Sequence, residues 1–305
     1  MDITKLIIPA AGFGTRFLPL TKSVPKEMIP LLSQPAIHYI VEEGIASGIE
    51  HFLIVTSRNK QALVNYLDAS PELEYFLEEK NKLDCIASIE KILRAAHFTY
   101  IRQSEAFGLG HAIWTARHTI GKEYIGICLP DDIIIGKQPA LSQLIRIARQ
   151  EKASVIAVQE VPPHVVSSYG VIAIKKQITP NLFQVSDLIE KPSTKDAPSN
   201  LAIIGRYILS HKIFHALNEI SDYATDELQL TDGISQMMKN NEKVFAYKVQ
   251  GTRYDIGTPI GWIKATISLA AQHPEYGPQI KEFLSDFDTL DSFLYNKEKN
   301  ISHHT

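Results

Sequence analysis

Short apolar runs alternate with longer amphipathic segments along most of this sequence, and this rhythm limits the possible fold more than any other feature. Five runs have the length and composition of buried strands, namely Leu6–Ile8, Phe52–Val55, Phe98–Ile101, Tyr124–Leu129 and Ser154–Val158. The spacing of amphipathic helices occurs in the segments 36–47, 59–67, 110–119 and 139–149. Because a helix between two strands forms a crossover connection, the pattern predicts a three-layer α/β fold. Its central sheet should be mixed, mostly parallel and covered by helices on both faces.

Two regions depart from this rhythm. The charged segment 71–96 is rich in helix formers, which predicts a helical insertion at about 69–97. After Gly170 the apolar runs become more strand-like, and they predict a smaller, partly antiparallel half at about 160–255 that grows from the same sheet. Since no flexible linker separates the halves, we expect one composite domain at 1–275, followed by a helical extension and a frayed tail at 276–305.

Composition narrows the classes of partner. The 305 residues carry a formal net charge of -3, whereas a general binder of nucleic acid or anionic membranes needs a strongly basic face. Cys85 and Cys128 cannot build a disulfide framework, which favours a reducing compartment. No run approaches the ~18 apolar residues that span a bilayer, and the apolar run before Pro9 is too short for a signal-peptide core. We therefore expect a cytoplasmic protein without nucleic-acid or membrane partners.

The segment from Pro9 to Arg16, PAAGFGTR, directly follows the first predicted strand. Its small residues let the backbone approach a ligand, and successive N–H groups can cradle phosphate oxygens. Lys22 and Lys26 lie close behind it in the chain. Phe17 stands where the dinucleotide fingerprint needs a small residue, and no Walker sequence follows. The loop is either a phosphate-binding loop of another type or a tight turn.

Charged residues also close two other predicted strands. Asp131 and Asp132 follow an apolar run, at the carboxyl edge where α/β proteins bind ligands, although Asp is also common in ordinary turns. Glu190 and Lys191 end a later strand before Pro192. There a lysine can act as a mobile charge for a phosphate, or the pair can be a solvated strand end.

Taken together, these motifs resemble those of the bacterial UTP–glucose-1-phosphate uridylyltransferases, a family of sugar-nucleotide pyrophosphorylases. The resemblance extends from about Lys5 to about Ile267 and rests on PAAGFGTRFLPLTKSVPKEMIPL, RQSEAFGLGHA, LPDD, SSYGVI, IEKP, SNLAIIGRYIL, TDELQLTD and GTRYDIGTPIGW. The related thymidylyltransferases usually differ at the PKEM run and lack the charged insertion. Two departures are Ile256, where many members have Cys, and Thr258-Pro259, which is similar to the thymidylyltransferase branch.

The resemblance implies a Rossmann-like nucleotidyltransferase fold that converts UTP and glucose-1-phosphate into UDP-glucose and pyrophosphate with Mg²⁺. It also implies a homodimer or homotetramer, and a sugar-binding role for the half at about 160–255. The triphosphate would be held by Arg16 and Lys26, the sugar phosphate by Lys191, and Mg²⁺ by Asp131 and Asp255. The implied substrate-binding positions are Ala10, Ala11, Gly12, Gly14, Thr15, Glu27, Gln103 and Gly108 for the nucleotide, and Gly170 and Glu190 for the hexose.

Between the adjacent aspartates, Asp131 is the expected metal ligand, because neighbouring strand-end residues point to opposite sides and the family's metal aspartate aligns with the first. Asp132 would then cap a turn, and its replacement by Asn should be the milder change. Alternative functions are a thymidylyltransferase-like enzyme and a non-catalytic sugar-nucleotide binder. The second is disfavoured because Arg16, Lys26 and both metal-site aspartates are present. A nicotinamide oxidoreductase is disfavoured by Phe17.

Overall fold

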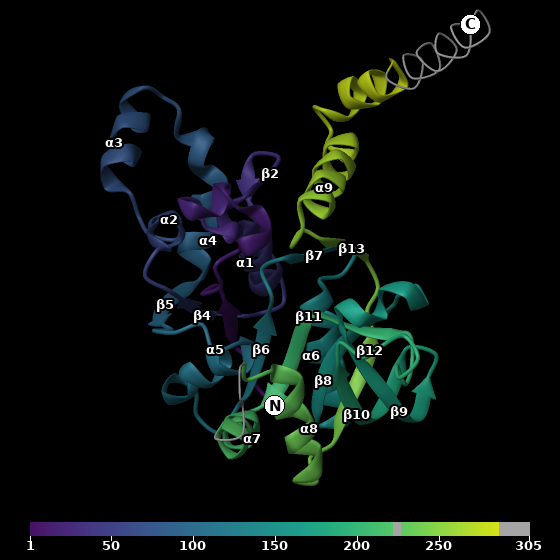
Figure 1. Cartoon of the computed structure of the whole chain (residues 1–305). Coiled ribbons are helices and arrows are strands. Elements are labelled where there is room, and N and C mark those ends of the chain that lie inside the picture. Colours follow the sequence, from purple (N-terminus) through teal and green to yellow (C-terminus); the bar gives the residue numbers. More distant parts are fainter. Residues whose placement is uncertain (222–226, 287–305) are drawn as a thin grey trace, which may run out of the picture.

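The computed structural model describes residues 1–221 and 227–286 (Figure 1). Among these residues, nine strands form one central sheet with the order β5-β4-β1-β6-β11-β8-β12-β10-β9. These strands are β1 (Lys5–Pro9), β4 (His51–Thr56), β5 (His97–Arg102), β6 (Tyr124–Cys128), β8 (Ser154–Glu160), β9 (Gly170–Thr179), β10 (Leu182–Glu190), β11 (Leu201–Ser210) and β12 (Val244–Lys248).

The first half of the sheet is parallel, as the alternating pattern predicts. β1 lies between β4 and β6, so that Leu6 pairs with Phe52 on one side and with Gly126 on the other. The crossover helices are α1 (Ala36–Ala46), α2 (Gln61–Tyr66) and α5 (Leu109–Thr115). The inner strands are apolar along nearly their whole length because both of their faces are covered.

The second half of the sheet is mixed. β11 pairs antiparallel with both β6 and β8, β12 is parallel to β8, and β9 and β10 form an antiparallel hairpin. β10 and β11 therefore run against the other strands of the sheet. An additional pairing of Ala202 with Val171 brings β9 back toward β11 and curls this end of the sheet.

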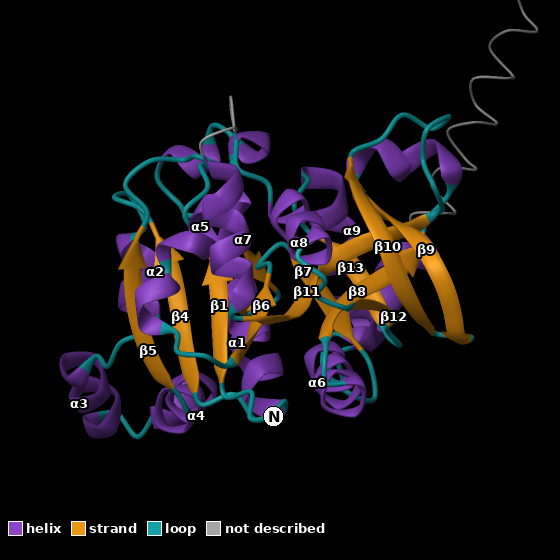
Figure 2. Ribbon diagram, turned by 90° about the horizontal axis from the view of Figure 1, so that it is seen from below, coloured by secondary structure: helices purple, strands orange, loops and turns teal. Residues whose placement is uncertain are grey.

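Helices cover both faces of the sheet and form two hydrophobic clusters (Figure 2). Successive residues of β1 divide between them, with Leu6 and Ile8 in one cluster and Ile7 in the other. The first cluster contains buried residues of α1 and of α6 (Ala140–Glu151), and the second contains those of α5, α7 (Lys212–Ser221) and α8 (Leu230–Lys239). The predicted three-layer architecture is confirmed.

The predicted insertion region contains α3 (Pro71–Glu79), a 3-10 turn at Leu83–Ile86 and α4 (Ala87–Ala95). α4 packs on α1 and buries Ile92, whereas every residue of α3 is at least partly exposed (Figure 1). The chain then enters β5.

Two short ribbons and a C-terminal helix complete the described chain. β7 (Asp132–Ile135) pairs with β13 (Thr252–Asp255), while β2 (Pro30–Leu31) pairs with β3 (Gln34–Pro35). α9 (Pro259–Gln272) follows β13, and residues 277–286 are helical. Single 3-10 turns occur at Thr15–Phe17, Leu20–Lys22, Lys26–Met28, Arg117–Thr119 and Pro163–Ser168. The part of the predicted tail beyond residue 286 lies outside the described residues. Within the described ranges, no helix combines the length and apolarity that a bilayer crossing requires.

Candidate active site

The glycine loop leaves the carboxyl end of β1 and folds back on itself. Gly14 adopts a φ of 67°, and a Cβ at this position would lie 3.1 Å from both Lys26 Cβ and Thr21 Cγ2. Glycine is therefore required both by the left-handed backbone and by the close approach of the returning chain. The Thr21 hydroxyl donates to the Gly14 carbonyl at 2.8 Å, which closes the loop and brings Lys26 beside it.

This loop forms one wall of a pocket of about 420 Å³, called here the larger pocket. The opposite wall comes from the segment after β5 and the start of α5. Gln103 is buried there, with its amide nitrogen 2.8 Å from His111 Nδ1. Gly108 has a φ of 94°, and a Cβ there would lie 2.7 Å from the Leu228 carbonyl oxygen. Of the predicted nucleotide-binding residues, those lining the pocket are Ala11, Gly12, Gly14, Thr15, Gln103 and Gly108.

A smaller pocket of about 170 Å³ adjoins the larger one, because Leu109, Leu129 and Asp131 line both. Its wall includes Glu190, whose Oε2 accepts a hydrogen bond of 3.1 Å from the Thr231 hydroxyl. A Cβ on Gly170 would lie 3.0 Å from the same oxygen. The absence of a side chain at Gly170 therefore keeps the Glu190 carboxylate accessible from the pocket.

Lys26 and Asp131 form an ion pair at the junction of the two pockets, with Nζ 2.7 Å from Oδ2. Burial opposes the charge on Lys26, but the carboxylates of Asp131 and Glu27 raise its pKa above the ordinary value. Burial also favours neutral Asp131, but the Lys26 ammonium outweighs it and lowers the pKa of Asp131. Both side chains are therefore charged at neutral pH.

Three charged side chains converge on one point beside Gly257, namely those of Arg16, Asp131 and Asp255. A Cβ built on Gly257 would lie 3.2 Å from Asp255 Oδ1, 3.4 Å from Asp131 Oδ2 and 3.4 Å from Arg16 Nη1. The Gly257 N–H donates to Asp255 Oδ1 at 3.0 Å, while the Arg16 guanidinium donates to the Gly257 carbonyl at 3.4 Å. The β7–β13 ribbon creates this convergence, because Asp132 and Asp255 are register partners. This ribbon carries Asp255 to the carboxyl edge of β6.

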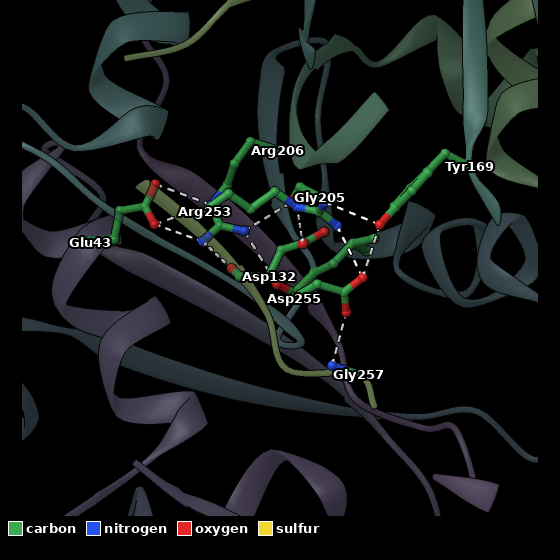
Figure 3. Close-up of polar contacts among 9 residues, drawn as sticks. Glu43, Asp132, Tyr169, Gly205, Arg206, Arg253, Asp255 and Gly257 are labelled. Carbon is green, nitrogen blue, oxygen red and sulfur yellow. Dashed lines mark hydrogen bonds and ion pairs between the residues drawn. The ribbon is translucent and has the colours of Figure 1, made fainter. Parts of the chain in front are cut away.

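Figure 3 shows the environment of Asp132, which differs from that of Asp131 described above. Its carboxylate is buried and accepts from Arg253 Nε at 2.5 Å, while its backbone carbonyl accepts from Arg206 Nη2 at 2.7 Å. Arg206 is itself fully buried and forms a bidentate ion pair with Glu43 of α1. Asp132 thus belongs to a buried ionic network. It is a residue of β7 that is paired with Arg253, rather than the turn cap suggested as an alternative.

Of the residues described, Ala10, Glu27 and Lys191 do not line either pocket, although the sequence places them in the site. The Ala10 N–H is bonded to the Val55 carbonyl. The Glu27 carboxylate is buried against Lys60, with Oε2 and Nζ 2.7 Å apart, and burial raises the pKa of Glu27. The Lys191 side chain is 56% exposed, and its Nζ lies 3.6 Å from Glu190 Oε1 at the rim of the smaller pocket.

Sequence reasoning missed Tyr169 and Arg253 as individual site residues. Both line the smaller pocket, and both contact the Asp255 carboxylate. They occur in the motifs SSYGVI and GTRYDIGTPIGW, but their residue types alone do not indicate this contact. It depends on the pairing of β7 with β13, which joins segments more than a hundred residues apart.

The family model described as "Nucleotidyl transferase" matches residues 5–272, and this chain belongs to that family. A sheet edge with a glycine loop and two adjoining pockets agrees with this class of protein. The fold class predicted from the sequence is confirmed.

Individual relatives are more specific. The chain is 43% identical over 284 residues to the UTP–glucose-1-phosphate uridylyltransferase YngB of Bacillus subtilis (strain 168), and the match covers 93% of this chain and 95% of that protein. A UTP-bound UGPase from Acinetobacter baumannii superposes with a TM-score of 0.85 at 37% identity, covering 93% of this chain and 99% of that one. A UDP-glucose pyrophosphorylase complexed with UDP-glucose has a TM-score of 0.80 at 38% identity, and the match covers 89% of this chain and 100% of that one. The predicted resemblance is confirmed.

Proposed function

We propose that this protein transfers a uridylyl group from UTP to glucose-1-phosphate, producing UDP-glucose and pyrophosphate. The observation that carries the proposal is the shared wall of the two pockets, where Asp131 and its partner Lys26 lie between a nucleotide-sized cavity and a smaller polar cavity. Such an arrangement brings a nucleotide α-phosphate and a sugar phosphate to the same place. The names of the relatives support the same reaction.

In the larger pocket, the base lies between the glycine loop and Gln103. The Gln103 amide nitrogen is already bonded to His111 Nδ1, which leaves the side-chain carbonyl oxygen to accept from the edge of uracil, and Gly108 leaves room for a planar ring. Gly14 and Thr15 approach the phosphates through their backbone. Glu27 acts indirectly in this proposal, because its pair with Lys60 fixes the turn that carries Lys26.

In the smaller pocket, the hexose lies against Gly170, and its hydroxyls donate to Glu190. The exposed Lys191 at the rim reaches the sugar phosphate as a mobile charge. A pocket of about 170 Å³ with this polar lining suits a single sugar ring better than a second nucleotide.

The reaction is an in-line displacement. An oxygen of the sugar phosphate forms a bond to the α-phosphorus of UTP, and the bond from that phosphorus to the oxygen bridging the β-phosphate breaks. Pyrophosphate leaves with the bonding electrons. Positioning and charge neutralisation supply the catalysis. Lys26 and Arg16 hold the phosphates in line and stabilise the negative charge that moves onto the leaving group.

A divalent cation fits the residues present, in keeping with the general use of divalent metals in this family. No group of three or more His, Cys, Asp or Glu side chains suited to a metal occurs among the described residues. Asp131 and Asp255 nevertheless direct hard oxygen atoms at one point, which suits Mg²⁺ because it commonly uses one or two carboxylates together with substrate phosphates. The Arg16 guanidinium, which faces the same point, would turn toward those phosphates. When bound, Mg²⁺ supplies charge neutralisation at the phosphate oxygens. Asp131 and Asp255 would hold it.

One assay separates this function from its alternatives. Pyrophosphate release is measured with each pairing of UTP or dTTP with glucose-1-phosphate or galactose-1-phosphate, in the presence of Mg²⁺. The proposal expects the highest kcat/KM for UTP with glucose-1-phosphate. A higher value with dTTP indicates a thymidylyltransferase-like enzyme, and binding of UDP-glucose without turnover indicates a non-catalytic binder.

The cytoplasmic location and the homodimeric or homotetrameric state also belong to this proposal, as implications of the resemblance.

A further inference from the structure

Several groups hold the Asp255 carboxylate at the end of β13 (Figure 3). Oδ1 accepts from the Gly257 N–H, and Oδ2 accepts from the Tyr169 hydroxyl at 3.2 Å. Arg253 Nη2 also lies 3.5 Å from Oδ2. Oδ2 is therefore turned toward Tyr169 and Arg253, while Oδ1 faces the point that it shares with Asp131.

Arg253 alone cannot fix this orientation. Its Nε is committed to Asp132 at 2.5 Å, so the guanidinium is divided between two carboxylates. The Tyr169 hydroxyl lies between Arg253 and Asp255, accepting from Arg253 Nη1 at 3.4 Å and donating to Asp255 Oδ2. Without that hydroxyl, the Gly257 N–H still holds Oδ1, but Oδ2 loses its hydroxyl partner and can turn into a closer pair with Arg253. That rotation would turn the carboxylate away from Asp131.

Tyr169 also contacts the other half of the site. Its backbone carbonyl accepts from the Lys191 N–H at 3.0 Å, and Lys191 adopts a φ of 45° at this turn. The next residue is Gly170, which packs against the Glu190 carboxylate. One residue therefore connects the candidate metal-site carboxylate with the segment that borders the sugar pocket.

We propose that Tyr169 is a positioning residue whose hydroxyl orients Asp255 for the divalent cation. The proposal rests on the function proposed above. A site with two protein carboxylates depends strongly on their orientation, and loss of the partner that orients a ligand typically weakens metal binding or activity about 10- to 100-fold. Water and substrate oxygens would supply the remaining ligands, and neither fixes the orientation of Asp255.

The test compares Tyr169→Phe, which removes the hydroxyl and retains the ring over Arg253, with the matched control Tyr254→Phe. Tyr254 lies on the same ribbon, but its hydroxyl bonds Ser268 at 2.9 Å, away from the site. Mn²⁺ binding is titrated by electron paramagnetic resonance on the free protein and on its UDP-glucose complex. We expect Tyr169→Phe to weaken Mn²⁺ binding about tenfold or more. We also expect it to lower kcat, partly rescued by high Mg²⁺, with KM for UTP changed less than about twofold. Tyr254→Phe should behave like the wild type.

Wild-type Mn²⁺ affinity in Tyr169→Phe would overturn the inference, even if turnover fell. An equal loss in both tyrosine variants would also overturn it, because it would indicate a general effect on the ribbon. A wild-type protein that releases no pyrophosphate would refute the proposed function instead. The Mn²⁺ titration of the free protein would still decide the role of Tyr169 in that case.

Discussion

The adjacent residues Asp131 and Asp132 permit a test in which one kind of substitution has two different consequences. Replacing either by Asn retains the shape and removes the charge. The Asp131 side chain is 30% exposed and lines both pockets. The Asp132 side chain lines only the smaller pocket, is 9% exposed and is paired with the equally buried Arg253. We expect Asp131→Asn to abolish activity in a stable protein and Asp132→Asn to destabilise a protein that retains activity.

The magnitudes follow from burial. Removing one partner of a buried ion pair costs about 3–5 kcal/mol, and Asp132→Asn should lie near the lower value because the amide oxygen still accepts from Arg253. At roughly 2–4 °C per kcal/mol for a protein somewhat smaller than this one, the melting temperature should fall by roughly 6–12 °C. The partly exposed pair of Asp131 with Lys26 contributes about 1 kcal/mol or less. Turnover should instead fall at least about 100-fold in Asp131→Asn. The reason is that the lost carboxylate would help to hold the divalent cation that neutralises the reacting phosphates.

The assay combines thermal unfolding with pyrophosphate release at a temperature at which both variants are folded. Two outcomes would refute the reasoning. One is a melting temperature of Asp131→Asn as low as that of Asp132→Asn. The other is an equal loss of turnover in the two folded variants, which would mean that the metal-site assignment between these neighbours is wrong.

Three further predictions concern the substrate pockets. Lys191→Ala should raise KM for glucose-1-phosphate more than KM for UTP, and equal effects on both would assign Lys191 to the triphosphate. Lys26→Ala and Arg16→Ala should lower kcat about 10²–10³-fold with the melting temperature nearly unchanged, whereas near-normal activity with lost stability would make them structural. Burial lowers the pKa of His111, so its neutral ring accepts from Gln103 at neutral pH. UTP affinity should therefore stay constant through the ordinary histidine range and decline only at more acidic pH, where the ring becomes protonated, and an affinity that does not change at acidic pH would contradict this pairing.

The strands of the fold could be predicted because their information is local. The run Phe52–Val55 is apolar on both faces and lies inside β4. The β7–β13 ribbon could not be predicted in this way. Asp132–Ile135 and Thr252–Asp255 are four-residue strands that pair across more than a hundred residues, and such a register leaves no periodic signal in either segment.

The candidate site shows the same division between local and long-range information. Gly14 and Gly108 could be assigned from their motifs, and both have the positive φ that their turns require. The family resemblance places Glu27 in the site, but the position of its carboxylate is set by Lys60, which arrives from the loop after β4. A contact from another element therefore decides that Lys26, and not Glu27, lines the larger pocket.

The charges at the junction of the pockets explain why such a site would need an added cation. Each of the three aspartates has a basic side chain nearby. Lys26 lies beside Asp131, and Arg253 lies beside Asp132. Both Arg253 and Arg16 lie near Asp255. These charges nearly cancel, so the pre-formed site is stable without ligand but carries little net positive charge. A nucleoside triphosphate and a sugar phosphate together bring several negative charges into the same space. In the proposed function, Lys191 would supply one positive charge at the rim, and a divalent ion held by Asp131 and Asp255 would supply the next. Removing metal should therefore abolish turnover even though every cationic side chain remains in place.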